Sequence, residues 1–472
     1  MPLSDFPRLP VEPGRYAAEW FIGGSALAGE IELSSARPAR LTVFGEAKPI
    51  VWKRQGRSRS AGFPQDHVVP EITGRLRTGH DVVATDAHLS VWMPQRTNGS
   101  ARSAVVGLGI AETPRRYPSL RLQVTGADLL FGTPPLKSVQ FPDPKQSGFQ
   151  GEFGATLNAR SVQTWRDRSL GITITCSDEG NFSLTNRYRH QLTFAPVIEF
   201  EGEPATVDEW MDFWVRPLLE LTALATRAPQ RLSWVTVHAA PSDSQERATR
   251  HSGVVFGSGI WQEPFTADEP AVRPDPDWKP LFTLGNLRTG LPSVLRVWRE
   301  QQASANPFLD LYRSVLMQPD LPPRARFLYL IQALEGLHGF EHRAADESAQ
   351  ATFQEKRQRA VVELDAAKLP PKTLRFIKDN WSRRRLDSLD RRLRELIADM
   401  PEAGRDAMEH RSLPLAAELE GEGEKRLDQM LRRLRNDLSH GTRQVEEDDL
   451  APWVELLERI AQHHLLSRLG IS

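Results

Sequence analysis

The order of apolar and polar residues divides this chain into a strand-rich N-terminal part and a helix-rich C-terminal part. Short apolar stretches with Gly, Ser and Pro between them recur from residue 17 to residue 257, as in AAEWFIGG, EITGRL, SAVVGLGI and HQLTFAPVIEFEG. Such stretches are typical of strands. Their close spacing, without long helices between them, predicts an antiparallel sandwich or barrel.

One helix is expected inside the strand-rich part, from Thr206 to Arg227. Thr206 is a suitable cap, and Asp208 and Glu209 place negative charge in the first turn. The apolar positions that follow have the spacing of one helix face. The helix should therefore pack on a core, with an interruption at Pro217.

From about residue 290 the apolar residues change to the spacing of helices. Helices are predicted over residues 291–303, 306–317, 322–338, 350–364, 371–399, 424–440 and 447–468. Such a run with short loops is typical of a helical bundle. The chain is therefore predicted to be an α+β protein of several parts. These are a strand-rich antiparallel domain over residues 1–262, a Pro-rich linker over 263–290 and an all-helical domain over 291–472.

Composition mainly excludes some functions. The length of 472 residues is enough for about two or three domains. A net charge of −1 argues against nucleic-acid binding through an overall basic surface. Cys176 is the only cysteine, which excludes an intramolecular disulfide and a cysteine-based zinc cluster. The N-terminus lacks the apolar segment of a signal peptide, and no apolar run is long enough to span a bilayer, so a soluble cytoplasmic protein is expected.

The candidate chemistry lies in the stretch RNDLSHG, from Arg435 to Gly441. This stretch ends the predicted helix 424–440, and Gly441 can terminate that helix in a left-handed conformation. The apolar face of the helix is predicted to comprise Leu427, Met430, Leu431, Leu434 and Leu438.

Arg435 and His440 form a pair suited to phosphodiester cleavage. A guanidinium can hold a phosphate with two hydrogen bonds, and an imidazole can move a proton near neutral pH, so the pair suits cleavage next to a 2′-hydroxyl without a metal. The spacing by itself favours an ordinary solvated helix end. In an ideal helix the two residues are about 140° apart around the axis. To reach one ligand, either the helix must loosen near Ser439 or the site must be shared with a neighbouring subunit.

RNDLSHG looks like the R-x4-H motif of HEPN-domain ribonucleases. The first variable position of that motif is typically Asn, Asp or His, and Asn436 fits it. The stretch RFLYLIQALEGLH, from Arg326 to His338, resembles the first core helix of the HEPN branch found in ApeA-type anti-phage proteins. The strand-rich part is similar to the domain that precedes HEPN in that family, so the resemblance covers most of the chain.

The resemblance implies a metal-independent endoribonuclease that cleaves tRNA or another cellular RNA to halt phage growth, with no cofactor. Arg435 would hold the scissile phosphate, and His440 would act as general acid or base. Asn436 would orient one of these groups or contact the phosphate, and Glu335 would support Arg435. Two motifs facing one cleft would require a homodimer or a higher homo-oligomer. The N-terminal domain would bind a phage-derived trigger or restrain the nuclease.

Two features near the predicted site leave alternatives open. Glu335 lies beside the apolar stripe of its helix, where a carboxylate needs a partner, and either Arg435 or a structural arginine would serve. His338 and His342 have a spacing that can chelate zinc. No H-E-x-x-H motif and no cysteine accompanies them, so the sequence favours no metal site.

The segment from Lys372 to Arg394 is basic, with nine Lys or Arg residues against three Asp residues. It is either a solvated helix surface or a guide for RNA phosphates, with binding that weakens as salt rises. In the second case the RNA-binding residues would be Arg383, Arg384, Arg385 and, from the motif helix, Arg432.

Two other classes of function also fit the sequence. In the first, the protein is a sensing module whose helical domain only dimerises or holds RNA. In the second, the strand-rich domain binds a carbohydrate or a nucleotide on exposed tryptophans, and the helical part is a scaffold. Nine of the twelve tryptophans precede residue 280, and the preferred interpretation is that they belong to the core of the strand-rich domain.

Overall fold

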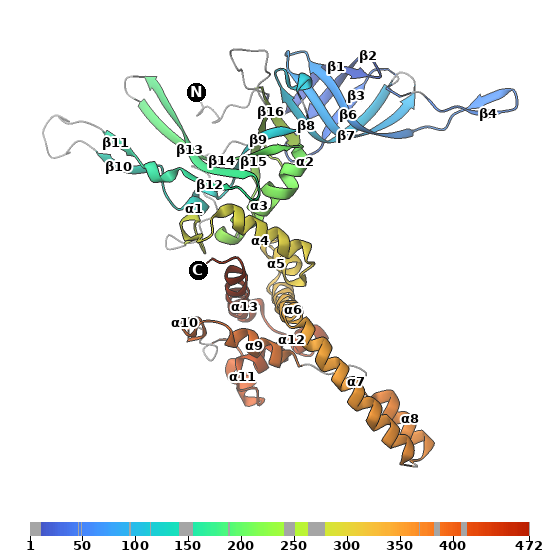
Figure 1. Ribbon diagram of the computed structural model, residues 1–472, viewed down its shortest axis with the longest axis vertical. Coiled ribbons are helices and arrows are strands. Elements are labelled where there is room, and N and C mark those ends of the chain that lie inside the picture. The colour runs from blue at the N-terminus through green and yellow to red at the C-terminus, as the bar shows by residue number, and fades with distance from the viewer. Residues whose placement is uncertain are drawn as a thin grey trace. The chain divides into compact units, whose positions relative to one another are not determined.

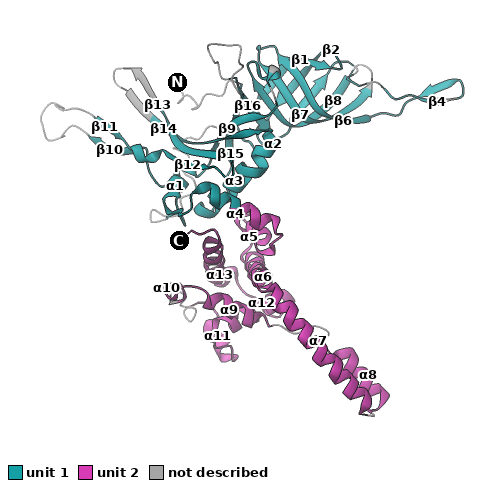
Figure 2. Ribbon diagram, viewed as in Figure 1, with its two compact units in different colours: residues 1–296 teal, residues 297–472 magenta. Residues whose placement is uncertain are grey.

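The computed structural model describes residues 11–45, 47–48, 50–93, 96–113, 115–140, 154–186, 189–239, 251–262, 279–367, 369–381, 388–406 and 413–471. The chain forms two compact units, Met1–Arg296 (unit 1) and Val297–Ser472 (unit 2), shown in teal and magenta in Figure 2. Unit 1 contains the described strands, and unit 2 is helical (Figure 1). The predicted α+β class, with an antiparallel N-terminal region and a helical C-terminal region, is confirmed at this level.

The first part of unit 1 is a closed antiparallel barrel. Its strands are β1 (Gly14–Ile22), β2 (Ser25–Leu33), β3 (Ala39–Val43), β6 (Gln65–Leu76), β7 (Asp81–Met93) and β8 (Arg96–Gly107). They are hydrogen-bonded in the order β8-β3-β2-β1-β6-β7, and β7 pairs again with β8. This second pairing closes the ring, so that each strand has a neighbour on both sides.

Trp20 of β1 is a fully buried side chain of the barrel core. Its indole Nε1 donates a hydrogen bond to the backbone oxygen of Thr42 at 3.3 Å. Gly29 of β2 and Gly74 of β6 border the indole, and a Cβ at these positions would lie 2.6 Å and 2.7 Å from its ring atoms. Only glycine fits beside the tryptophan at these two places.

An open antiparallel sheet continues from β8. Its strands are β9 (Tyr117–Val124), β12 (Gln163–Asp167), β13 (Ile172–Asn186), β14 (Arg189–Ala205), β15 (Leu232–His238) and β16 (Ser252–Gly257). Residues 97–101 of β8 pair with β3, whereas residues 103–107 pair with β16, so this strand belongs to both the barrel and the sheet. From β16 the order is β15-β9-β14-β13-β12, which makes one twelve-stranded sheet.

Smaller elements complete unit 1. Two hairpins pair separately from the large sheet, namely β4 (Lys53–Gln55) with β5 (Ser58–Ser60), and β10 (Leu136–Gln140) with β11 (Gly154–Leu157). A short helix, α1 (Ala127–Phe131), follows β9.

The helix predicted from Thr206 to Arg227 is present. It consists of α2 (Val207–Trp210), a π-helical turn (Met211–Val215) and α3 (Arg216–Thr226). The helix begins with a capping box, in which the side chains of Thr206 and Glu209 accept hydrogen bonds from each other's backbone N–H. The π-helical turn ends just before Pro217, whose missing N–H prevents a regular α-helical ladder there.

Unit 2 is a helical bundle built around α6 (Pro323–Glu341), which packs against α5, α9, α12 and α13. Helix α4 (Leu291–Ala303) contains the division between the two units. The other helices of unit 2 are α5 (Pro307–Met317), α7 (Arg343–Ala366), α8 (Pro371–Asn380), α9 (Leu389–Ala398), α10 (Glu402–Asp406), α11 (Ala416–Gly421), α12 (Leu427–His440) and α13 (Glu447–Arg468). Helices α7 and α8 form a hairpin beyond the end of α6 (Figure 1), and their described residues include none that is buried. In the part of the chain that the structure describes, every helix is too short or too polar to cross a bilayer.

The predicted helices agree with the observed ones in position, and differ mainly at their ends. The helices predicted over 291–303 and 447–468 match α4 and α13 to the residue. The single helix predicted over 371–399 is replaced by α8 and α9, because an extended Trp381 ends α8. Residues 382–387 between them lie outside the described residues.

The predicted linker over 263–290 is described only from residue 279 onward. That described portion packs into unit 1: Phe282 and Leu284 are each 2% exposed, and the Leu281 N–H donates to the backbone oxygen of Ala225 at 2.8 Å. The division between the units falls after Arg296, inside α4.

Candidate functional site

Helix α12 carries the R-x4-H motif, and its apolar face is the predicted one. Its buried apolar residues are Leu427, Met430, Leu431, Leu434 and Leu438. Gly441 follows the helix with a φ of 67°, the left-handed conformation expected of a glycine at this position. These two predictions are confirmed.

The helix stays regular through the motif. His440 is its last residue, and the N–H of Gly441 still bonds to the oxygen of Asp437, four residues earlier. The expected loosening near Ser439 is therefore absent, and this alternative is wrong. Arg435 is half-buried and His440 is exposed, on helix faces that an ideal helix separates by about 140°. Of the two routes to a common ligand, a site shared between subunits is the one that remains.

Asp437, inside the motif, fixes the end of α12. Its carboxylate is 4% exposed, and Oδ1 accepts a hydrogen bond from the Thr442 hydroxyl at 2.8 Å. Oδ2 lies 3.3 Å from Arg433 Nε and 3.6 Å from Arg443 Nε. Arg443 also pairs with Glu422, and so ties the loop after His440 to the chain just after α11. Sequence reasoning gave Asp437 no role, although its partners Arg433, Thr442 and Arg443 all lie within six residues of it.

Arg435 differs from the other arginines of α12 in having no acidic partner among the residues that the structure describes. Arg432 pairs with Glu424 at 3.0 Å, and Arg433 pairs with Asp437. Within the described residues, the hydrogen bond of the Arg435 guanidinium goes to the Asn436 side-chain oxygen at 3.2 Å, and no carboxylate pairs with it. Among the described residues, its charge therefore has no ion-pair partner and is available to an anion. The role predicted for Asn436 stays a prediction, and this hydrogen bond is compatible with it.

Glu335 pairs with a different arginine from the one predicted. It lies on α6 and faces α9, where Arg392 Nη1 is 3.6 Å from Glu335 Oε1. In the described chain, no ion pair joins Glu335 to Arg435. The alternative of a structural arginine is the one observed, and the assignment of Glu335 as a support for Arg435 is corrected.

The basic segment 372–394 is described only in part, and Arg383, Arg384 and Arg385 lie outside the described residues. The described cations of this segment are largely in ion pairs: Lys378 with Asp365 at 2.6 Å, and Arg394 with Asp428 at 3.1 Å. Arg432, the fourth predicted RNA-binding residue, is half-buried and also paired, with Glu424. Cations already paired with a carboxylate attract phosphate less than the guanidinium of Arg435, which pairs with no carboxylate among the described residues.

A histidine cluster that sequence reasoning did not assemble lies at the end of α6. His338 is 1% exposed, and its Nε2 lies 2.6 Å from Glu395 Oε2 of α9. The hydrogen bond with His338 holds the pKa of the Glu395 carboxyl below its ordinary value. The ring of His342 lies 4.3 Å from that of His338, centre to centre. The two-histidine spacing was visible in the sequence, but the carboxylate comes from a distant helix.

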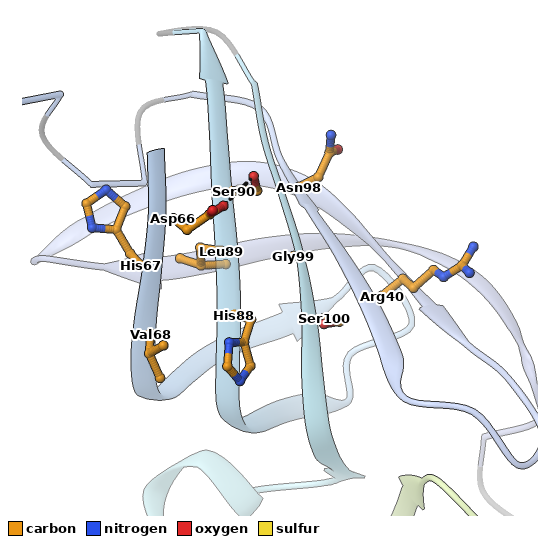
Figure 3. A pocket seen from close by; sticks show the side chains of 10 residues that line it. All are labelled: Arg40, Asp66, His67, Val68, His88, Leu89, Ser90, Asn98, Gly99 and Ser100. Carbon is orange, nitrogen blue, oxygen red and sulfur yellow. Dashed lines mark hydrogen bonds between the residues drawn. The ribbon is translucent and has the colours of Figure 1, made fainter. Parts of the chain in front are cut away.

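The outer surface of the barrel carries a shallow groove of about 540 Å³ (Figure 3). Residues of β3, β6, β7 and β8 line it, among them Arg40, His67, His88 and Asn98. Asp66 and Ser90 are joined across it by a hydrogen bond of 2.7 Å. This groove is one candidate surface for a ligand-binding role of unit 1.

The tryptophans of unit 1 divide between core and surface. Trp20, Trp210 and Trp234 are at most 2% exposed, which confirms the core interpretation for these three. Trp52 and Trp92 are each 53% exposed, so the surface role remains open for them.

Comparison with known proteins adds no relative: no family model, no curated protein and no solved structure matches this chain.

Proposed function

We propose that the protein is an endoribonuclease of the HEPN type that cleaves RNA next to a 2′-hydroxyl through Arg435 and His440. The observation that best supports this proposal concerns the Arg435 guanidinium. It has no carboxylate partner among the described residues, whereas the neighbouring Arg432 and Arg433 of the same helix are in ion pairs. A half-buried guanidinium usually has a partner of opposite charge, so an external anion is the natural ligand.

In the proposed reaction, Arg435 binds the non-bridging oxygens of the scissile phosphate and stabilises the charge that develops on them. The RNA 2′-oxygen attacks phosphorus as its proton passes to a general base, and the bond to the 5′-oxygen breaks as that oxygen takes a proton. His440 performs one of these two proton transfers. The products are a 2′,3′-cyclic phosphate and a 5′-hydroxyl, and the step needs no metal or redox partner.

The regular helix supports a homodimer as the active form. Because Arg435 and His440 lie on different faces of α12, we propose that the Arg435 of one subunit and the His440 of its partner act on the same phosphate. The resemblance to ApeA-type proteins supports a role in anti-phage defence, with tRNA or another cellular RNA as substrate. Unit 1 would then sense the trigger or restrain the nuclease.

The test is incubation of the purified protein with total bacterial RNA, followed by mapping of the cut ends, with and without EDTA. Extract from phage-infected cells is added in a parallel series, to supply a trigger. The parent should produce 2′,3′-cyclic phosphate ends, and His440→Ala and Arg435→Ala should reduce the rate by at least about 100-fold. Arg459→Ala, which removes an exposed helical arginine paired with Glu455, is the matched control and should cleave like the parent.

The same assay separates this function from RNA binding without cleavage. A binding module would retain RNA without cutting it in every series, and Arg435→Ala would lose affinity alone. Cleavage that is equal in the parent and both site variants would remove the Arg/His pair from the chemistry.

A further inference from the structure

Three potential metal ligands converge where α6, α7 and α9 meet. His338 is on α6, His342 is the single residue between α6 and α7, and Glu395 is on α9. One ligand atom from each residue can be chosen so that all three lie within 4.8 Å of one another. Two imidazoles and a carboxylate are a donor set that zinc and other first-row divalent ions bind.

The burial of His338 leaves one of its nitrogens without a partner. Its Nε2 faces Glu395, whereas the buried Nδ1 has no hydrogen-bond partner among the described residues. A neutral ring that donates through Nε2 leaves Nδ1 as an unsatisfied acceptor, and a charged ring leaves it as an unsatisfied donor. Either state is costly in a buried site. A metal ion in place of the proton between Nε2 and Glu395 Oε2 would make both of these atoms ligands and would leave Nδ1 as the protonated nitrogen of the ring.

The surrounding charges are compatible with a bound cation. Arg391 lies 3.7 Å from Glu395 Oε1, so the other carboxylate oxygen, Oε2, is the one directed at the histidines. Arg392 is engaged with Glu335 at 3.6 Å. The two imidazole rings, 4.3 Å apart between their centres, are close enough to bind one ion together.

We propose that His338, His342 and Glu395 bind one divalent transition-metal ion, zinc being the first candidate, with water in the open coordination position. The ion joins the α6–α7 junction to α9. It therefore holds the base of the α7–α8 hairpin, whose described residues contribute nothing to the buried core. The role is structural and does not depend on the proposed nuclease reaction.

The test is zinc binding by untagged, full-length protein that has been stripped of metal and then titrated against a competing chromophoric chelator. One zinc per chain is expected, together with a rise of the melting temperature, because a ligand of the folded state stabilises it. Replacement of zinc by cobalt should give visible absorption bands that report the coordination. His342→Ala should weaken zinc binding by at least about 100-fold, and Glu395→Gln by about 10- to 100-fold.

These two variants are chosen because His342 and Glu395 are partly exposed, whereas truncation of the buried His338 risks unfolding. His463→Ala, which removes a half-buried histidine from α13, is the matched control and should bind zinc like the parent. Far-UV circular dichroism checks that each variant is folded. Equal zinc affinity in the parent and in both cluster variants, or no saturable binding at one ion per chain, would overturn the proposal.

Discussion

At the residue scale, Arg435 and Arg432 show why the sequence of one helix does not predict which of its arginines form ion pairs. Both are arginines of α12, three residues apart, and the sequence assigned both to RNA. Arg432 is compensated by Glu424 and, at 4.0 Å, by Asp390 of α9. Arg435 has no ion pair with either acid. The difference depends on which helices meet α12, and a single sequence does not contain that information.

Asp178 of β13 gives a prediction for the pH dependence of stability. Burial raises the pKa of Asp178 to about 6, and its Oδ2 has no hydrogen-bond partner among the described residues. An aspartate in the unfolded chain titrates near 3.9. The folded state therefore binds more protons than the unfolded state between these two pKa values, and stability falls as pH rises through that window.

Asp178→Asn should accordingly raise the free energy of unfolding at pH 8, and the gain should disappear below about pH 4, where Asp178 is protonated in both states. Urea unfolding followed by tryptophan fluorescence at the two pH values measures the difference. Asp320→Asn, which removes the same charge from an exposed position, is the control. A gain that is the same at both pH values would contradict the proposed cause.

At the element scale, the barrel depends on the space that two glycines leave for Trp20. A Cβ on Gly29 would lie 2.1 Å from the Thr42 backbone oxygen, so Gly29→Ala must shift β3 or the indole. We expect a loss of about 1–3 kcal/mol in the free energy of unfolding, the usual cost of overpacking. Gly62→Ala, where nothing lies within 4 Å, should change stability by less than about 0.5 kcal/mol in the same urea titration.

The positions of individual helices were the feature of the structure that the sequence predicted best. The periodicity of α4 and α13 predicted their ends to the residue, because apolar spacing depends on local geometry. The closure of the barrel was not predictable, because it depends on β8 pairing with both β7 and β3. For the same reason Glu395 was missed as the third member of the histidine cluster: it lies on α9, far along the chain from His338.

At the scale of the whole molecule, the proposal that two subunits share the site makes a testable prediction, because α12 is regular to His440. If Arg435 of one subunit acts with His440 of the other, a mixed dimer of Arg435→Ala and His440→Ala chains contains one intact pair and one doubly damaged pair. Each homodimer of a single variant contains no intact pair. Random mixing gives mixed dimers as half of the population, so activity should return to about a quarter of the parent value.

The measurement uses co-expressed chains with two different tags, assayed for RNA cleavage under conditions in which the parent cleaves. Mixed dimers isolated through both tags should then reach about half of the parent rate, because one of two sites is intact. The control is a mixed dimer in which both chains carry His440→Ala, and it should be inactive. If Arg435 and His440 of the same chain form the site, mixing the two variants restores nothing, because each chain lacks one member of the pair. The regular end of α12 favours the first outcome, since a single straight helix holds the two side chains on different faces.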